Sequence, residues 1–269
     1  KKNLIDCCNC LYINYHNDVS TEMSNKIKKN DKVLVLAPEE NLIMYDLIKS
    51  IEDKQISHLN SSSSFISKST NKFELNVLLQ NSKKYLIKTY KNYEKIHINN
   101  RVVAKIFDGI GAENLFIFKN RYDLEKNIHK LTKFHIFQEY IKGEIIGINI
   151  VVKNNKVFIL SINEQIYKYS SDHEIFLCKI NIGKYNYMLD KFKIFVENIL
   201  SNLNDSFGFI GIDAILTDDQ EIIFLEINPR LTTSYVGLRE SLGINPFAFL
   251  HKNISSFNIA NNKLITLSI

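Results

Sequence analysis

Residues 207–230 read FGFIGIDAILTDDQEIIFLEINPR, and this stretch decides how the rest of the chain is interpreted. Two apolar runs flank a short polar segment, a pattern that predicts a β-hairpin. A tight turn at residues 219–220 places Asp213 opposite Glu226, with their Cβ atoms about 5 Å apart. Because side chains alternate along a strand, Asn228 lies on the same face as Glu226. The hairpin therefore gathers three oxygen-bearing side chains.

Two opposed carboxylates among isoleucine, leucine and phenylalanine repel each other and resist burial. A divalent cation removes this conflict, since Mg²⁺ usually takes one or two carboxylates with phosphate oxygens and water. The alternative is an edge hairpin whose acids face solvent. That alternative does not explain why the acids occupy only the two matching positions. We therefore expect Asp213, Glu226 and Asn228 to bind Mg²⁺ or Mn²⁺.

A second candidate site is residues 101–111, RVVAKIFDGIG, where Lys105 interrupts an apolar strand that leads into a loop with two glycines. Such a loop can present backbone N–H groups to phosphates while the lysine supplies a positive charge. The stretch has neither the GxxxxGK[ST] pattern of a P-loop nor the third glycine of a dinucleotide fingerprint. The alternative is a surface lysine at a strand end.

The third candidate is residues 138–144, QEYIKGE, which lie where we expect one lobe to pass into the next. Free backbone groups and an apolar lining at such a crossover suit an adenine ring. Glu144, just beyond it, could accept hydrogen bonds from two ribose hydroxyls. The alternative is an ordinary linker with a glycine turn.

The hydrophobic pattern divides the chain into three expected lobes, at residues 1–70, 71–140 and 141–269. The first is a βα lobe, and the other two mix strands and helices, so the predicted fold class is α+β. The expected helices are 41–51, 72–81, 123–131 and 191–203, with a loop at 61–64. The expected strands are 33–36, 85–88, 101–107, 115–118, 136–140, 144–152, 156–162, 207–216 and 221–228.

Composition excludes several classes of protein. The chain has 269 residues, 45% hydrophobic and 23% charged, with a formal charge of +5. No lysine- or arginine-rich block alternates with aromatics, so we expect no nucleic-acid partner. No apolar run approaches the roughly 18 residues that span a bilayer, so we expect no membrane partner and a cytoplasmic location. Cys7, Cys8 and Cys10 are too tightly clustered for a metal or redox motif, so we expect reduced thiols.

The order of the three candidate sites resembles the ATP-grasp superfamily over about residues 30–250. This resemblance implies an N-terminal βα lobe, here shortened, followed by two α+β lobes that clamp ATP. It implies that Lys72 and Lys105 bind phosphates and that Arg230 and Lys105 act in catalysis. Gln138, Glu139 and Ile141 match the adenine linker, Glu144 the ribose acceptor, and Asp213, Glu226 and Asn228 the magnesium ligands.

Three further stretches resemble a narrower family, the tyramine–L-glutamate ligases of methanofuran biosynthesis and their bacterial relatives. They are residues 34–40 (LVLAPEE), 163–165 (NEQ) and 226–235 (EINPRLTTSY). This resemblance implies that the substrate side is formed by Asn163, Gln165, Thr232, Thr233, Ser234 and Tyr235. Glu164 stands where that family's pattern has arginine.

The implied function is an ATP- and magnesium-dependent ligase that joins a carboxylate to an amine through an acyl phosphate, with glutamate and tyramine as one pair. Positioning and charge neutralisation supply the rate in such phosphoryl transfers, so no side-chain nucleophile is expected. The partners would be small molecules, with a homodimer as the assembly. The alternatives are an ATP-grasp small-molecule kinase and a nucleotide-binding module without catalysis.

Overall fold

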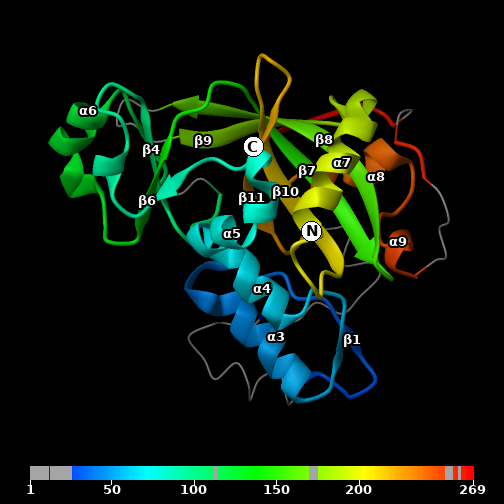
Figure 1. Ribbon diagram of the computed structural model, residues 1–269. Coiled ribbons are helices and arrows are strands. Elements are labelled where there is room, and N and C mark those ends of the chain that lie inside the picture. The colour runs from blue at the N-terminus through cyan, green and yellow to red at the C-terminus, as the bar shows by residue number, and fades with distance from the viewer. Residues whose placement is uncertain (1–11, 13–25, 112–113, 170–174, 252–256, 260–261) are drawn as a thin grey trace.

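The computed structural model describes residue 12 and residues 26–111, 114–169, 175–251, 257–259 and 262–269 (Figure 1). Cys7, Cys8 and Cys10 lie outside the described residues. Cys178 is a free thiol whose Sγ lies 3.2 Å from the carbonyl oxygen of Ile166.

The first part of the described chain is a small βα unit. Strands β1 (Lys32–Val33) and β2 (Ser57–His58) pair in parallel, and helices α3 (Ile43–Asp53) and α4 (Ser63–Thr70) pack together below the large sheet in Figure 1. The predicted strand at 33–36 is shorter than expected. The Asn60 side chain replaces a neighbouring strand there, donating to the Val35 carbonyl at 2.9 Å and accepting from its N–H at 2.8 Å.

Two predictions in this unit were wrong about local structure. The stretch 61–64 is only half loop, because helix α4 begins at Ser63 and the Ser62 hydroxyl caps it by accepting from the Phe65 N–H. Serine is a preferred N-cap residue, so the polar run marks a helix start. The predicted helix at 41–51 begins later, at Ile43, after a short 3-10 helix (Glu40–Leu42) in which Asn41 and Leu42 have positive φ.

A four-stranded antiparallel sheet follows, in the order β3 (Thr89–Tyr90), β6 (His135–Glu139), β4 (Val102–Ile106) and β5 (Phe116–Phe118). One face packs on an apolar cluster, and residues of the other face line a cavity. Helix α5 (Lys72–Leu78) precedes this sheet. Helix α6 (Arg121–Lys126) lies between β5 and β6 along the chain and is followed by a 3-10 helix (Ile128–Lys130).

Two element predictions for this part were also wrong. The stretch 85–88 is not a strand, because a 3-10 helix (Gln80–Tyr85) precedes it and only Leu86 forms a β-bridge, to Phe224. The helix predicted to be capped by Asp123 is capped instead by Asn120, whose side chain accepts from the Asp123 N–H at 2.9 Å.

The largest unit is a six-stranded antiparallel sheet in the order β11-β10-β7-β8-β9-β12. Its strands are β7 (Glu144–Lys153), β8 (Lys156–Tyr169), β9 (Ile175–Ile182), β10 (Gly208–Leu216), β11 (Ile222–Asn228) and β12 (Ile265–Ser268). The β7–β8 hairpin turns at Asn154 and Asn155, both with positive φ, as a tight primed turn requires. That turn was predicted correctly.

The two faces of this sheet are covered differently. Helix α7 (Leu189–Leu200) lies on one face (Figure 1). Its Phe192 and Phe195 belong to one apolar cluster with isoleucines of β7 and β10. Part of the other face packs on helices α8 (Tyr235–Leu242) and α9 (Ala248–His251). Other residues of the six-stranded sheet, both apolar (Ile145, Ile215) and acidic (Asp213), line the cavity together with residues of the four-stranded sheet. The α+β prediction is confirmed.

Candidate active site

The predicted acidic pair forms at the edge of the six-stranded sheet, where Asp213 of β10 pairs directly with Glu226 of β11. The turn that was expected to produce this pairing is different, because Leu216 pairs with Ile222 and the Thr217 N–H donates to the Glu221 carbonyl. A β-bulge then shifts the register between Asp213 and Ala214. The bulge adds one residue on β11, which restores the expected partner.

Asp213 is partly buried and held by two amide groups. The Gln165 Nε2 donates to its Oδ1 at 2.8 Å, and the Asn228 Nδ2 donates to its Oδ2 at 2.9 Å. Burial, with the neighbouring charge of Glu226, raises the pKa of Asp213 to about 7. Both hydrogen bonds and Arg230 oppose this rise. The carboxylate is therefore placed where its negative charge lacks a full counter-charge.

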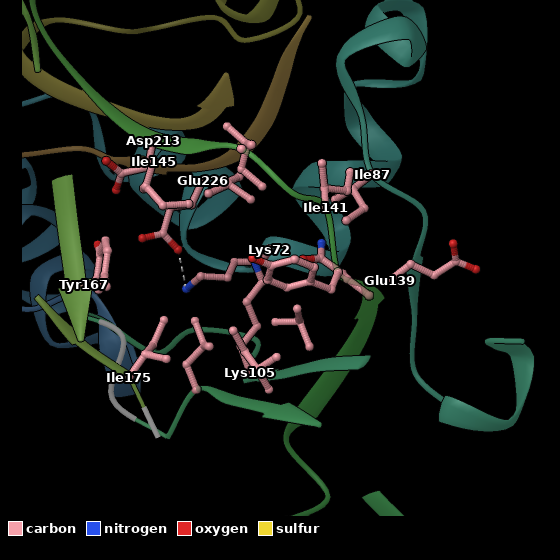
Figure 2. Close-up of a pocket in the computed structure, with 18 of the residues that line it drawn as sticks. Lys72, Ile87, Lys105, Glu139, Ile141, Ile145, Tyr167, Ile175, Asp213 and Glu226 are labelled. Carbon is pink, nitrogen blue, oxygen red and sulfur yellow. Dashed lines mark ion pairs between the residues drawn. The ribbon is translucent and has the colours of Figure 1, made fainter. Parts of the chain in front are cut away.

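Glu226 faces two lysines across the cavity between the sheets. Lys72 Nζ lies 3.3 Å from Glu226 Oε2, an ion pair that Figure 2 shows as a dashed line. Burial opposes ionisation of Glu226, but the charges of Lys72 and Lys105 outweigh it and hold its pKa below the ordinary value. The acidic pair thus has one carboxylate matched by lysine and one that is not.

Lys105 lies on β4, on the face of the four-stranded sheet that lines the cavity. Its side chain is buried, and burial lowers its pKa to about 8, partly offset by Glu226. The alternative interpretation, a surface lysine at a strand end, therefore does not describe it. Lys72, at the start of α5, also donates to the carbonyl of Gly109, in the glycine loop that follows β4.

A cavity between the two sheets joins these charged groups to an apolar wall. Gln138, Glu139 and Ile141 all line it, as expected for an adenine linker. The Gln138 side chain is buried and donates to the Thr89 hydroxyl at 2.8 Å. The Glu139 carboxylate points away from the acidic pair (Figure 2). The apolar wall is formed by Ile87, Val103, Ile106, Leu115, Ile117, Ile141, Ile145, Ile175, Ile215 and Leu225.

Glu144, expected at the ribose, lies elsewhere in the structure. It accepts a hydrogen bond from the Tyr185 hydroxyl and lies 3.8 Å from Lys184 Nζ. Tyr185 belongs to the apolar cluster under α7, on the opposite face of the sheet from Asp213. Glu144 is not among the residues that line the cavity.

Arg230 is brought near the acidic pair but is held by another acid. Its Nε lies 2.9 Å from Oε1 and 3.0 Å from Oε2 of Glu39, and its Nη1 donates to the Leu231 carbonyl. Glu39 is buried, and burial raises its pKa against the opposing effect of Arg230. The N-terminal unit therefore contacts the end of β11 through a charged pair.

The residues expected on the substrate side fall into three environments. Thr232 and Ser234 join a buried network with Asn149, in which the Thr232 hydroxyl donates to Asn149 Oδ1 at 2.8 Å. Thr233 is exposed, and Tyr235 packs edge-on against Phe209 and Phe247 in an apolar cluster.

The other two expected substrate residues lie on β8. The Asn163 side chain is fully buried, with Oδ1 accepting from the Gly183 N–H and Nδ2 meeting no acceptor among the described residues. Gln165 contacts Asp213 instead of standing free.

Two residues at the site were not predicted. Tyr167 lines the cavity and donates its hydroxyl to Gln165 Oε1 at 2.8 Å. Burial, Asp213 and Glu226 raise the pKa of Tyr167 above its ordinary value, so it stays a hydroxyl at neutral pH. The sequence did contain one indication: Tyr167 follows Gln165 by two residues on one strand, so the two side chains share a face. The second residue is Glu39. It lies in residues 34–40, which were noted for a family resemblance but were given no function.

The acidic pair has the chemistry of a magnesium site. Two carboxylates and an amide oxygen are hard oxygen donors of the kind that Mg²⁺ prefers. Burial is the main cause of the raised pKa of Asp213, followed by the neighbouring charge of Glu226. Within the described ranges, no group of three or more His, Cys, Asp or Glu side chains could hold a metal ion. A Mg²⁺ site in a protein usually needs only one or two carboxylates, which these residues can supply.

Family comparison agrees with the fold. Residues 69–234 match an ATP-grasp domain model, and residues 2–66 match a pre ATP-grasp domain model. The first match covers more than half of the chain and includes Lys72, Lys105 and the acidic pair. No helix in the described part of the chain has the length and apolarity needed to cross a membrane.

Two curated relatives are tyramine–L-glutamate ligases. The protein from Methanocaldococcus fervens is 29% identical over 251 residues, covering 91% of this chain and 72% of the relative. The protein from Methanocaldococcus jannaschii is 30% identical over 232 residues, covering 84% of this chain and 65% of the relative. The chain therefore spans about two thirds of the length of these relatives.

Solved structures share the fold at low sequence identity. An ATP-grasp superfamily protein from Archaeoglobus fulgidus superposes with a TM-score of 0.69 at 19% identity, covering 93% of this chain and 80% of that one. An L-amino acid ligase from Bacillus licheniformis gives 0.61 at 18% identity, covering 82% and 54%. The biotin carboxylase domain of the Hydrogenobacter thermophilus 2-oxoglutarate carboxylase, solved with MgADP, gives 0.71 at 11% identity, covering 91% and 58%.

These comparisons confirm the resemblance drawn from residues 101–111, 138–144 and 207–230. The four-stranded sheet, the residues that line the cavity and the acidic pair beside two lysines all lie within the matched region. The chain belongs to the ATP-grasp family and is similar to the ligases of that family that join tyramine to L-glutamate.

Proposed function

We propose that this protein is an ATP- and magnesium-dependent ligase that joins a carboxylate to an amine through an acyl phosphate. The observation that carries the proposal is the acidic pair Asp213 and Glu226 facing Lys72 and Lys105 across a cavity with an apolar wall. A nucleotide has the complementary parts, since its phosphates carry negative charge and its base is flat and apolar. The positive charges of the lysines would attract the phosphates, and the negative charges of the two carboxylates would attract a divalent cation.

The residues divide the work by position. Lys72 and Lys105 would bind and orient the phosphates, and the backbone at Gln138–Ile141 would contact the base. The apolar wall excludes water, which strengthens each electrostatic contact and limits hydrolysis. Magnesium held by Asp213, Glu226 and Asn228 would neutralise the phosphate oxygens during transfer. Arg230 would approach the transferred phosphoryl group from the end of β11.

The proposed reaction has two steps. An oxygen of the substrate carboxylate attacks the γ-phosphorus of ATP, the bond to the bridging oxygen breaks, and ADP leaves. The amine nitrogen then attacks the acyl carbon, phosphate leaves, and the nitrogen loses a proton. Positioning and charge neutralisation are the protein's contribution, so no side chain needs to form a covalent intermediate.

Glutamate and tyramine are the substrates to test first, because two curated relatives are named for that pair. Asn163 and the loop Thr232–Tyr235 remain the proposed substrate-side residues, and Glu144 the proposed ribose acceptor after a local rearrangement. We propose that the reaction belongs to methanofuran-type biosynthesis and takes place in the cytoplasm, where ATP is available. A homodimer is the assembly to test by light scattering, since one structural relative is described as a dimer.

The deciding measurement is ADP release with Mg-ATP across a panel of acids and amines, with product detection by mass spectrometry. We expect ADP only when both an acid and an amine are present, together with the condensed amide. ADP release with a single acceptor and no amine would identify a kinase instead. Bound ATP without turnover for any pair would favour a non-catalytic nucleotide-binding module.

A further inference from the structure

Three side chains form a hydrogen-bonded line that ends on the acidic pair. The Tyr167 hydroxyl donates to Gln165 Oε1 at 2.8 Å, and Gln165 Nε2 donates to Asp213 Oδ1 at 2.8 Å. Tyr167 and Gln165 lie two residues apart on β8, so their side chains share one face of the sheet. Tyr167 lies on the cavity wall near Glu226 and Asp213 in Figure 2.

A glycine makes this line possible. Strand β7 lies between β8 and β10, so Gln165 must reach across β7 to contact Asp213. It crosses at Gly147, which is paired with Asp213 on one side and Asn163 on the other. A Cβ atom at Gly147 would lie 2.3 Å from Gln165 Nε2 and 3.4 Å from Asp213 Oδ1. Any side chain at this position would push the amide out of its path.

The orientation of the Gln165 amide matters for Asp213. A carboxamide presents either an N–H donor or a carbonyl oxygen, and only the donor is favourable beside a carboxylate. The Tyr167 hydroxyl donates to Gln165 Oε1. This hydrogen bond favours the amide orientation in which Gln165 Nε2 faces Asp213. The Asn228 amide holds the second Asp213 oxygen. Both carboxylate oxygens are therefore fixed by N–H donors.

We propose that Tyr167 is a positioning residue for the metal site, acting through Gln165 to hold the Asp213 carboxylate in the orientation that faces Glu226. The inference rests on the proposed function, because it takes the acidic pair as the metal-binding group. Partners behind metal ligands commonly change metal affinity by about 10- to 100-fold when removed. Tyr167 stands one residue further out, and losing one neutral hydrogen bond implies a smaller change, about three- to tenfold.

The test measures Mn²⁺ binding to the ADP complex by electron paramagnetic resonance, together with ADP affinity in the absence of metal. Tyr167→Phe removes only the hydroxyl, and Gln165→Leu removes the amide. We expect Tyr167→Phe to weaken Mn²⁺ binding about three- to tenfold and to leave metal-free ADP affinity unchanged. In the Gln165→Leu background the same change should have no further effect, because Tyr167 then has nothing to orient.

Two matched variants accompany this cycle. Gly147→Ala should weaken Mn²⁺ binding as much as Gln165→Leu, since the added methyl displaces the amide. Tyr93→Phe removes a phenol hydroxyl whose ring packs on Phe137, in the cluster on the far face of the four-stranded sheet, and should change neither affinity. Thermal melting checks that each variant is folded.

The outcomes separate the inference from the function on which it rests. An unchanged Mn²⁺ affinity in Tyr167→Phe, or an equal loss in both backgrounds, would overturn the positioning role. A loss of metal-free ADP affinity would also overturn it, by making Tyr167 a nucleotide contact. If Asp213→Asn leaves Mn²⁺ binding unchanged as well, the metal site itself is misassigned and the proposed function fails.

Discussion

Two polar clusters lie on the same face of the six-stranded sheet, and they differ in how their charges and hydrogen bonds are met. The neutral cluster is Asn149, Ser161, Thr232 and Ser234. Asn149 donates to both serine hydroxyls, at 2.9 and 2.8 Å, and accepts from Thr232 and Ser234. Every side chain of this cluster has a hydrogen-bond partner within it, so the cluster has no unmet charge that calls for a cation or a phosphate.

The acidic cluster is Asp213, Glu226, Lys72 and Lys105, and it is not complete. Its lysines come from outside the six-stranded sheet and meet the carboxylates at the cavity between the two sheets. Asp213 has a raised pKa and Lys105 a lowered one, each mainly because of burial. A buried polar group that is fully hydrogen-bonded stabilises a fold, whereas buried charges with shifted pKa values beside a cavity indicate a functional site.

The largest effect that should separate the clusters comes from Glu226→Gln. We expect ADP formation to fall about 10³-fold, because a lost metal ligand removes several kcal/mol of charge stabilisation. Glutamine keeps the shape of the side chain and a carbonyl acceptor for Lys72. The measurement is ADP release at saturating Mg-ATP, with circular dichroism to check the fold.

A matched control for this variant is Glu164→Gln. Glu164 is a partly buried carboxylate on β8 that is hydrogen-bonded to Lys184 and Asn181. We expect its turnover to stay within about threefold of the parent, because the change leaves the acidic pair and its hydrogen-bond partners intact. Equal losses in the two variants would mean that the acidic pair has no special role.

The next largest effect concerns Lys105→Met. Methionine fills a similar volume and carries no charge that burial would destabilise. We therefore expect the melting temperature of the free protein to stay the same or to rise. ADP affinity should fall about 10- to 100-fold, the worth of a charge-assisted contact. Isothermal calorimetry and thermal melting measure the two effects. Lower stability with unchanged affinity would make Lys105 a structural residue.

A smaller effect is the pH dependence of ADP binding. Burial lowers the pKa of Lys105 to about 8, so the lysine loses its proton above that pH. We expect the contribution of Lys105 to ADP affinity to be constant below about pH 7 and to fall by up to about tenfold per pH unit above about 8. Calorimetry at a series of pH values measures this, and Lys105→Met should abolish the dependence.

The stability of the free protein should move in the opposite direction over the same range. The unfolded chain keeps Lys105 protonated up to its ordinary pKa of 10.5, so it binds more protons than the folded chain between about 8 and 10.5. Stability rises with pH wherever the unfolded state binds more protons. The Lys105 contribution to the free energy of unfolding therefore increases with pH, which denaturant titrations of parent and Lys105→Met can resolve.

The smallest effect on nucleotide binding is expected from Asn149→Ala in the neutral cluster. This change leaves the Ser161, Thr232 and Ser234 hydroxyls without their shared partner, so the free energy of unfolding should fall by about 1–3 kcal/mol. ADP affinity should stay the same. A large loss of ADP affinity with unchanged stability would remove the distinction between the two clusters.

Sequence reasoning found the acidic pair although it was wrong about the turn. Counting back from a two-residue turn placed Asp213 opposite Glu226, and the structure reaches the same pairing through a wider turn and a bulge. The predicted pairing is nevertheless found, because the bulge between Asp213 and Ala214 corrects the register after the turn. Register is strongly specified where one face of a sheet is apolar and buried. Lys105 was likewise visible as a charge inside an apolar strand.

The contacts beyond the motifs could not be predicted, because they join distant parts of the chain. Gln165 reaches Asp213 across the strand that carries Gly147, and Arg230 meets Glu39 of the N-terminal unit. Glu144 has the motif position of a ribose acceptor, yet its side chain lies with Tyr185. Spacing along a strand gives the face of a side chain but not which neighbour it reaches.

The sequence by itself determined the α+β class, the metal-site candidates and the family, because these depend on hydrophobic period and on polar residues at fixed spacing. Only the tertiary structure decided which polar groups have all their hydrogen bonds met within the protein and which charged groups face a cavity. That distinction depends on burial and on partners brought together by strand order, as when Lys72 and Glu226 meet across the cavity. Charges and hydrogen bonds are local in space, and only the folded chain sets those distances.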